Sequence, residues 1–262
     1  MDYVTLQVRE DHIGIVTFSR PPINAVDLQS NIELAVTFEE INRRDDIWCV
    51  ILRAEGKGFM SGSDVDAFSG FNDQLLQENE DADVRSILAV YNCRVPVICQ
   101  VQGYVMGHGT TLAAASDLIV AADDTYFSLP EVTICVVGGT DAIRQLVSEK
   151  YLRYMAYTGK KVGVREIARY GNILRIVPRA IALDTAIEVA HKIIKNYTVS
   201  VQSAKAAIQA LVCHDKAKDF YIDCLYTHQL LRDPMRATVL QEHHRRMEQK
   251  RKMKEAQLQT DS

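Results

Sequence analysis

The stretch "VPVICQVQGYVMGHGTTLAAASDLIVAA", residues 95–122, joins two apolar runs through a glycine-punctuated turn and a run of small residues. The first and last runs, 95–103 and 118–122, are typical of buried strands, and the small residues after Gly107 have helical spacing. Strand, turn, helix and strand in this order form the unit from which proteins with parallel sheets are built. The stretch therefore predicts the α/β fold class.

The turn in this stretch, Gly107-His108-Gly109, opens the expected helix. Backbone N–H groups and the positive end of the helix dipole make such a turn suited to an anion. No Lys-Ser/Thr pair follows the glycines as a P-loop requires, and no third glycine completes a dinucleotide fingerprint. We therefore expect an anion that forms only during a reaction.

Upstream of this stretch, alternating apolar residues predict a hairpin over residues 3–18, and Asp27 is placed to cap an amphipathic helix. "CVILRA", residues 49–54, predicts a buried strand, and the glycine-rich residues 55–68 predict a structured loop. The acidic segment "NDQLLQENEDADVR", residues 72–85, has the polarity of a mobile lid, with a helix following from Val84.

Downstream, nearly all of the chain from Thr140 onward has helical patterning, with Asp233-Pro234 marking one helix start. We expect two parts, an α/β core over residues 1–195 and a helical region over 196–262. Helices that cannot bury all their apolar faces alone should pack on the core or on another subunit.

Composition excludes several classes of protein. The net charge of −4 gives no overall attraction to nucleic acid or an anionic membrane, and no segment has the length to span a bilayer. The six cysteines form no CxxC pair, and the adjacent His243 and His244 do not share a helical face, so we expect no metal site and no disulfide framework. A cytoplasmic protein is expected. The basic run from His243 is interleaved with glutamates and lacks aromatic residues, so nucleic acid is not an expected partner.

Four segments in their order resemble the crotonase, or enoyl-CoA hydratase/isomerase, superfamily along nearly the whole chain. They are "RPPINAVD", "GKGFMSGSDV", the stretch from residue 95 to 132 that ends in "FSLPEV", and "YMAYTGKKVGVREIARYGNILRIVP". The resemblance implies a spiral of β-β-α turns followed by helices that make subunit contacts in a trimer or hexamer. It also implies an acyl-CoA thioester as substrate, with no cofactor besides the coenzyme A that the substrate carries.

Enzymes of this superfamily stabilise the oxyanion that forms as charge moves onto the thioester carbonyl. By position in the motifs, the backbone N–H groups of Ser63 and His108 are the donors, and Gly62, Asp64 and Gly107 contact the substrate. His108 stands where the family commonly has glycine. Its imidazole is either an acid or base in the pocket, or packs elsewhere while only its N–H acts.

Glu131 matches the second of two glutamates that hydratases of the family use, and a carboxylate in an apolar pocket suits proton transfer. The first glutamate is replaced by Thr111. Thr111 either orients a water molecule or is only a small packing residue. Asp141 either supplies the missing carboxylate or is a helix N-terminal residue favoured by the dipole.

One carboxylate favours double-bond isomerisation, which members with a single glutamate at this position perform, while hydration of an enoyl-CoA stays open. Alternatives are decarboxylation or thioester hydrolysis within the superfamily, or a CoA- or RNA-binding protein without catalysis. The lysine that often follows the adenine loop is absent, since Asp66 and Ala67 stand there. Lys57, Arg20 and the basic run are the candidate contacts for the CoA phosphates.

Overall fold

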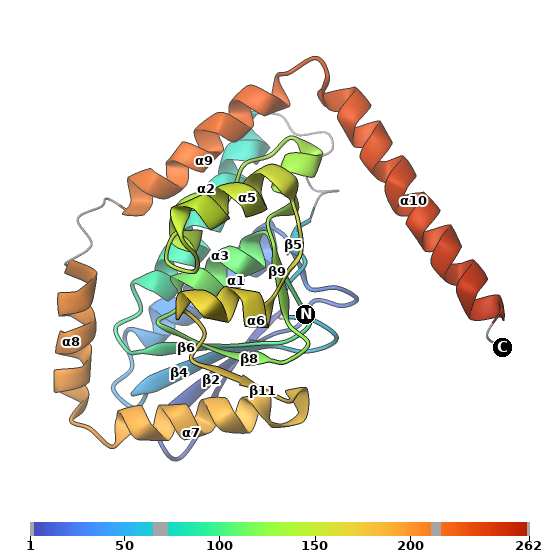
Figure 1. The fold of residues 1–262 in the computed structure, drawn as a ribbon. Helices are drawn as coiled ribbons and strands as arrows, with labels where there is room; N and C mark the ends of the chain where they lie inside the picture. Colours follow the sequence, from blue (N-terminus) through green and yellow to red (C-terminus); the bar gives the residue numbers. More distant parts are fainter. Residues whose placement is uncertain (1–2, 65–72, 211–215, 261–262) are drawn as a thin grey trace.

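A six-stranded sheet forms the base of the protein, which the computed structural model describes over residues 3–64, 73–210 and 216–260 (Figure 1). Its order is β1-β2-β4-β6-β8-β11, and only the β1–β2 pair is antiparallel. The strands of this sheet are Val4–Val8 (β1), Ile13–Phe18 (β2), Cys49–Ala54 (β4), Val97–Val101 (β6), Leu118–Ala122 (β8) and Arg175–Val177 (β11). The hairpin and the buried strands predicted from the sequence are thus confirmed.

Two small sheets carry the turns above this base. Strands β7, β9 and β10 form one sheet, and β3 pairs in parallel with β5 in the other. Their bounds are Ala25–Val26 (β3), Gly62–Ser63 (β5), Tyr104–Met106 (β7), Tyr126–Ser128 (β9) and Val162–Gly163 (β10). Gly62 is the first residue of β5 and Gly107 directly follows β7, so these short strands position both glycine turns.

Helices cover both faces of the main sheet (Figure 1). They are Leu28–Ile41 (α1), Asp73–Tyr91 (α2), His108–Ala115 (α3), Thr140–Ile143 (α4), Glu149–Thr158 (α5), Val164–Ile167 (α6), Ala182–Ile194 (α7), Thr198–Ala210 (α8), Lys216–Leu231 (α9) and Arg236–Thr260 (α10), with 3₁₀ turns at Pro130–Ile134 (η2), Ala168–Tyr170 (η3) and Arg179–Ile181 (η4). One apolar core lies under α1, α2 and α3, and a second lies between the opposite face and α7. No helix in the described ranges combines the length and apolarity needed to cross a bilayer.

Helix α1 begins where the sequence predicts, because Asp27 caps it through a reciprocal capping box with Ser30. The expected lid over residues 72–85 is wrong. Helix α2 begins at Asp73, eleven residues before Val84, and amide–carboxylate pairs one turn apart, such as Gln74 with Glu78, support its exposed face. Residues 65–68 of the expected loop lie outside the described residues.

The region after Thr140 also differs from the prediction, because Val162–Gly163 (β10) forms a strand beside β9 and Arg175–Val177 (β11) forms one beside β8. Helix α8 is tied to the core by Lys205, whose buried ammonium group donates to Asp117 at 2.7 Å and to the Val95 carbonyl at 3.1 Å. Helix α9 lies over α2, and α10 extends away from the body (Figure 1).

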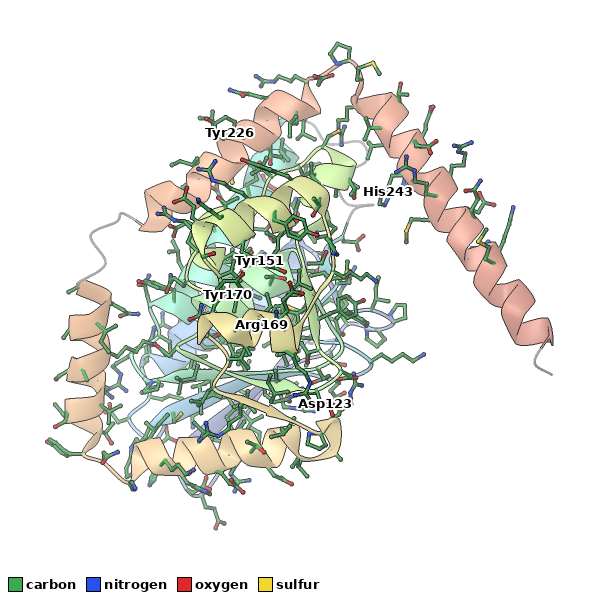
Figure 2. The ribbon with its side chains drawn as sticks, in the orientation of Figure 1. Asp123, Tyr151, Arg169, Tyr170, Tyr226 and His243 are labelled. Carbon is green, nitrogen blue, oxygen red and sulfur yellow. The ribbon has the colours of Figure 1, made fainter. Side chains whose placement is uncertain are left out.

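The tyrosines of α5 are packed only in part. Tyr151 lies in ring contact with Tyr154 and with Tyr170, whose centroid is 5.1 Å away (Figure 2). Tyr157 is exposed. On α10 the basic side chains Arg245 and Arg246 both pair with Glu242. These ion pairs lie on the surface of the helix that projects into solvent.

Candidate active site

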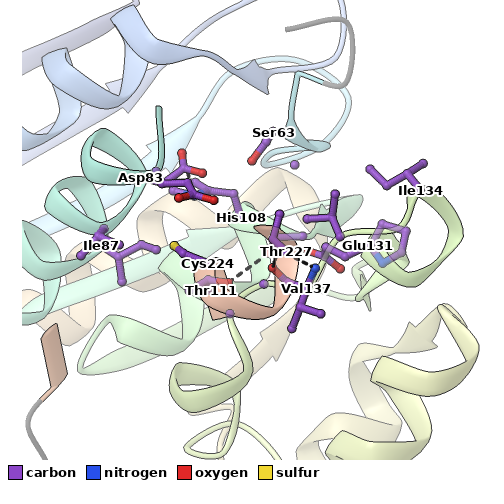
Figure 3. Close-up of a pocket in the computed structure, with 18 of the residues that line it drawn as sticks. Ser63, Asp83, Ile87, His108, Thr111, Glu131, Ile134, Val137, Cys224 and Thr227 are labelled. Carbon is purple, nitrogen blue, oxygen red and sulfur yellow. Dashed lines mark hydrogen bonds and ion pairs between the residues drawn. The ribbon is translucent and has the colours of Figure 1, made fainter. Parts of the chain in front are cut away.

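A cavity lies between the two glycine turns and the helices above them (Figure 3). One side, which we call the turn wall, comes from the ends of β5 and β7, the start of α3, and the segment from η2 to Gly139. The other side, the helix wall, comes from α2 and α9. The turn wall includes Gly62, Ser63, Gly107, His108, Thr111 and Glu131, and the helix wall includes Glu80, Asp83, Ile87, Cys224 and Thr227.

The two glycine turns touch each other. Gly107 has φ 53° and ψ −121°, its N–H donates to the Ser128 carbonyl at 3.0 Å, and Gly62 has φ 101°. A Cβ atom on Gly62 would lie 3.4 Å from the Met106 carbonyl oxygen. Since both positions need a left-handed backbone and close approach, glycine is required at each. The contact brings Ser63 and His108 to the same cavity.

Glu131 reaches this pair of turns from η2, which starts at Pro130. A Cβ atom on Gly107 would lie 2.8 Å from the Glu131 Oε1, so the carboxylate rests against the turn itself. Cys135, in a left-handed conformation, closes η2, and the Val136 N–H donates to the Glu131 carbonyl at 3.1 Å. The structure therefore places the candidate carboxylate beside the candidate anion site.

Thr111 lines the cavity but is 2% exposed. Its hydroxyl donates to the Gly107 carbonyl at 3.3 Å. Gly139 packs directly on that hydroxyl and has no space for a side chain. The hydroxyl is therefore engaged with backbone of its own helix, and the surrounding chain closes over it.

The other candidates are not brought together with Glu131. Asp141 is buried in the first turn of α4, outside the cavity lining. Asp64 pairs with Arg20 at 3.0 Å, and Arg20 also pairs with Asp27. Burial lowers the pKa of the Arg20 guanidinium, but the Asp64 hydrogen bond and the charges of both carboxylates outweigh burial and raise that pKa. Among the described residues, no cluster of side chains has the make-up of a metal site.

Asp83, which lies beside His108 in the cavity lining, was not among the residues expected from the sequence. The His108 Nδ1 lies 3.7 Å from the Asp83 Oδ1, and the His108 Nε2 lies 3.3 Å from the Ser86 hydroxyl. Asn31 donates its amide N–H to the same Asp83 oxygen and accepts a hydrogen bond from Ser86 at 2.9 Å. Four side chains from α1, α2 and α3 thus form one network.

Burial dominates the electrostatics of this network. It raises the pKa of the Asp83 carboxyl, while the nearby His108 and the Asn31 hydrogen bond act in the opposite direction. It lowers the pKa of His108, against the influence of Asp83. Both groups are therefore biased toward their neutral forms. The imidazole packs into the network, and its backbone N–H lies at the start of α3.

The helix wall contains a second pair that the sequence did not indicate. Glu80 on α2 meets His228 on α9 at 2.8 Å, and burial raises the pKa of Glu80 against the effect of His228. Next to it, the Thr227 hydroxyl accepts from the Val137 N–H at 3.0 Å and donates to the Val137 carbonyl at 2.9 Å. Helix α9 is thus bonded to α2 on its own side of the cavity and to the turn wall on the other. Its separation in sequence from α2 hid these contacts.

Comparison with known proteins shows which enzymes the chain is similar to. The family model for enoyl-CoA hydratase/isomerase matches residues 9–255. A Rhodococcus jostii RHA1 protein, named (7aS)-7a-methyl-1,5-dioxo-2,3,5,6,7,7a-hexahydro-1H-indene-carboxyl-CoA hydrolase, is 34% identical over 87% of this chain and 88% of its own. The carnitinyl-CoA dehydratase of Escherichia coli K12 is 30% identical over 75% of this chain and 77% of its own.

Solved structures of enoyl-CoA hydratases have a similar fold. The crystal structure of a probable enoyl-CoA hydratase from Mycobacterium thermoresistibile is 25% identical, with a TM-score of 0.79 over 87% of this chain and 98% of that one. An enoyl-CoA hydratase/isomerase from Pseudoalteromonas atlantica T6c is 18% identical, and its TM-score of 0.83 shows likeness of fold alone.

Proposed function

The chain belongs to the enoyl-CoA hydratase/isomerase family, and from that premise we propose that Ser63, His108 and Glu131 carry out enolate chemistry on an acyl-CoA thioester. Membership confirms the fold expected from the sequence, a crotonase-type α/β spiral with a helical C-terminal region. The protein is an acyl-CoA enzyme of this family. The roles of its residues and the reaction are the proposal.

The N–H groups of Ser63 and His108 would hold the thioester oxygen. The first N–H groups of a helix have no partner within it, and His108 is the first residue of α3. Fixed donors aimed at a developing charge need no reorganisation during the reaction, and losing one such donor typically costs about 3 kcal/mol of barrier. The contact between the turns at Gly62 and Gly107 supports this assignment.

The observation that carries the proposal is the contact of the Glu131 carboxylate with the Gly107 turn. A thioester bound with its oxygen at that turn presents its C2 atom beside the carboxylate. Glu131 would then remove a C2 proton while the electron pair moves onto the thioester oxygen. Returning the proton to C4 of a 3-enoyl-CoA moves the double bond into conjugation, so isomerisation needs no second group on the turn wall.

A second candidate function is the addition or removal of water, or hydrolysis. Two relatives carry the names of a hydrolase and a dehydratase. The helix wall adds the carboxyl groups of Glu80 and Asp83 to the cavity that Glu131 lines. Such reactions need a group that activates or protonates an oxygen in addition to the C2 base.

We also propose that the protein is a homo-oligomer. Exposed apolar side chains recur on the last three helices, at Val199 and Ile208 of α8, at Leu225 and Tyr226 of α9 (Figure 2), and at Met247 of α10. They fit subunit contacts made by residues 196–262 in a homotrimer or hexamer.

We further propose that catalysis needs no cofactor besides the substrate's own coenzyme A. Sedimentation and metal analysis of the active protein test these two statements.

Deuterium exchange at C2 tests the proposed function directly. The purified protein should exchange the C2 protons of butanoyl-CoA in D₂O, measured by mass, and convert a 3-enoyl-CoA to the conjugated thioester, measured by absorbance. Glu131→Gln should slow both about 10²- to 10⁴-fold, the usual contribution of a general base. Glu149→Gln is the control, because this exposed carboxylate on α5 pairs with Arg153. Exchange that survives in Glu131→Gln would refute the role of Glu131.

A further inference from the structure

Asp83 is a carboxyl group of the helix wall, and it is more exposed to the cavity than the imidazole it contacts. Its side chain is 28% exposed, whereas that of its partner His108 is 4% exposed. Figure 3 shows Asp83 and Glu131 on different sides of the cavity, with Thr111 and Thr227 between them. A substrate in the cavity would therefore meet the Asp83 carboxyl group rather than the edge of the imidazole ring.

The carboxyl group is held in one orientation through a single oxygen. Among the described residues, Oδ1 is the atom that receives the Asn31 hydrogen bond and that lies 3.7 Å from His108. Ser86 fixes both partners, because its hydroxyl donates to Asn31 and lies 3.3 Å from the imidazole. Contacts concentrated on Oδ1 leave Oδ2 as the oxygen that a substrate can reach.

We propose that Asp83 is a catalytic general acid and base for an oxygen at C3 of the acyl chain, acting opposite Glu131. This inference rests on the proposed function, in which Glu131 transfers the C2 proton. With this role for Asp83, the substrates are a 2-enoyl-CoA, which gains water, and a 3-hydroxyacyl-CoA, which loses it. The second carboxyl group of the site then comes from α2, where the resemblance led us to look for it on α3.

The reaction balances as the removal of one water molecule. Glu131 takes a proton from C2, and the electron pair moves onto the thioester oxygen to form the enolate. As the enolate collapses, a double bond forms between C2 and C3 and the bond from C3 to oxygen breaks. Asp83 gives its proton to the departing hydroxyl group, which leaves as water. Addition of water follows the same steps in reverse, with Asp83 taking a proton from water.

The groups around Asp83 suit this role. His108 on α3 faces it, Glu80 lies one turn away on α2, and His228 on α9 contacts Glu80 at 2.8 Å. Burial raises the pKa of Asp83 and keeps His108 biased toward its neutral form. A carboxylic acid whose pKa lies closer to neutrality can give and regain a proton at physiological pH.

The neighbouring polar groups are less suited to this step. Glu80 is engaged by His228 across the seam between α2 and α9. The Thr111 hydroxyl donates to the Gly107 carbonyl and is almost fully buried. Asp83 combines a position in the cavity lining, partial exposure and an acid that burial favours.

The test compares water addition with C2 exchange. Asp83→Asn preserves shape and can still accept from Asn31, so it should fold, which a thermal unfolding curve checks. It should slow the addition of water to 2-enoyl-CoA thioesters about 10²- to 10⁴-fold and leave C2 exchange of butanoyl-CoA within about 3-fold. Glu78→Gln, an exposed carboxylate on α2 bonded to Gln74, should change neither rate.

The outcomes separate the two proposals. A wild-type protein without C2 exchange overturns the proposed function. The role of Asp83 alone is overturned in two cases. In the first, the wild type exchanges C2 protons but adds no water; in the second, Asp83→Asn adds water at the same rate as the wild type. Loss of both activities in a folded Asp83→Asn also overturns it, because the residue would then act through His108 on the turn wall.

The pH dependence gives a measurement that needs no variant. Removal of water from a 3-hydroxyacyl-CoA requires Asp83 to hold its proton, so its rate should fall at alkaline pH along a limb that C2 exchange lacks. Identical alkaline limbs for the two reactions would overturn the proposal.

Discussion

The two walls of the cavity are built by different means. On the turn wall, backbone hydrogen bonds hold the turns in place, such as Gly107 N–H to Ser128 and Met106 N–H to the Met60 carbonyl. On the helix wall, side chains make the contacts, as Glu80 does with His228 and Thr227 with Val137. The backbone hydrogen bonds that hold the turns do not change with protonation, whereas the side-chain contacts of the helix wall include groups that titrate.

This difference suggests a division of labour between the walls. A site for a transient oxyanion works best when its donors are fixed before the charge appears. A site that passes protons to varied acyl groups needs side chains whose pKa values burial can adjust. The turn wall should therefore be intolerant of changes in shape, and the helix wall of changes in charge.

Among the variants that test this comparison of the walls, the largest effect should come from a change of shape on the turn wall. Gly107→Ala introduces a Cβ atom 2.8 Å from the Glu131 Oε1, at a φ of 53° that side chains rarely adopt. We expect kcat to fall about 10²- to 10³-fold, because the His108 N–H and Glu131 both move. Stability should fall by about 1–3 kcal/mol from backbone strain, measured by urea unfolding.

Gly171→Ala is the matched control for this variant. Gly171 has φ 79°, and nothing lies within 4 Å of where its Cβ atom would be. It should lose about 1 kcal/mol of stability and keep its activity. Equal activity losses in the two variants would break the comparison between the walls, since strain alone would then explain them.

A smaller effect is expected from a change of charge on the helix wall, and it should raise stability where Gly107→Ala lowers it. Burial raises the pKa of Asp83 above its ordinary value of 3.8. The stabilising contribution of this group is therefore full below about pH 3.8 and is lost as the pH rises through the raised pKa. Asp83→Asn removes that loss and should melt about 2–4 °C higher than the wild type at pH 8.

The sign of this prediction can be checked by calorimetry across pH. The gain in Tm should shrink as the pH falls through the raised pKa, and it should be smallest below about pH 3.8, where the carboxyl group is mostly neutral in both states. Glu78→Gln, on the exposed face of the same helix, should show no such trend. A variant that is less stable than the wild type at pH 8 would show that the Asp83 carboxylate is stabilised by its neighbours.

The smallest effect should come from Thr111, which belongs to the turn wall but whose hydroxyl bonds only within that wall. Thr111→Val keeps the shape and removes a long hydrogen bond of 3.3 Å. We expect kcat/KM to stay within about 3-fold and stability to change by about 1 kcal/mol or less. A loss beyond 10-fold would return Thr111 to the list of groups that act on water.

The predictability of the site follows the same division. Much of the turn wall could be named from the sequence, because the glycine turn at 107–109 is a local pattern and the resemblance to the superfamily points to Ser63, His108 and Glu131. Asp83 could not, since an acidic segment was interpreted as a mobile lid. Its helix is stabilised by contacts with α1 and α9 that no local pattern records. The strand at Arg175–Val177 escaped notice for a similar reason, because it forms by pairing with β8.

The packing of Gly139 on Thr111 limits the changes of sequence that are open to this protein. Gly139 has φ 70° and no room for a Cβ atom against the Thr111 hydroxyl. A glutamate at position 111 would need the same space, so the single substitution that matches the two-glutamate pattern of the family would not fit the present backbone. Residues 138–139 would have to move first. The two-glutamate pattern is therefore open to this sequence only if a change at residues 138–139 precedes the one at position 111.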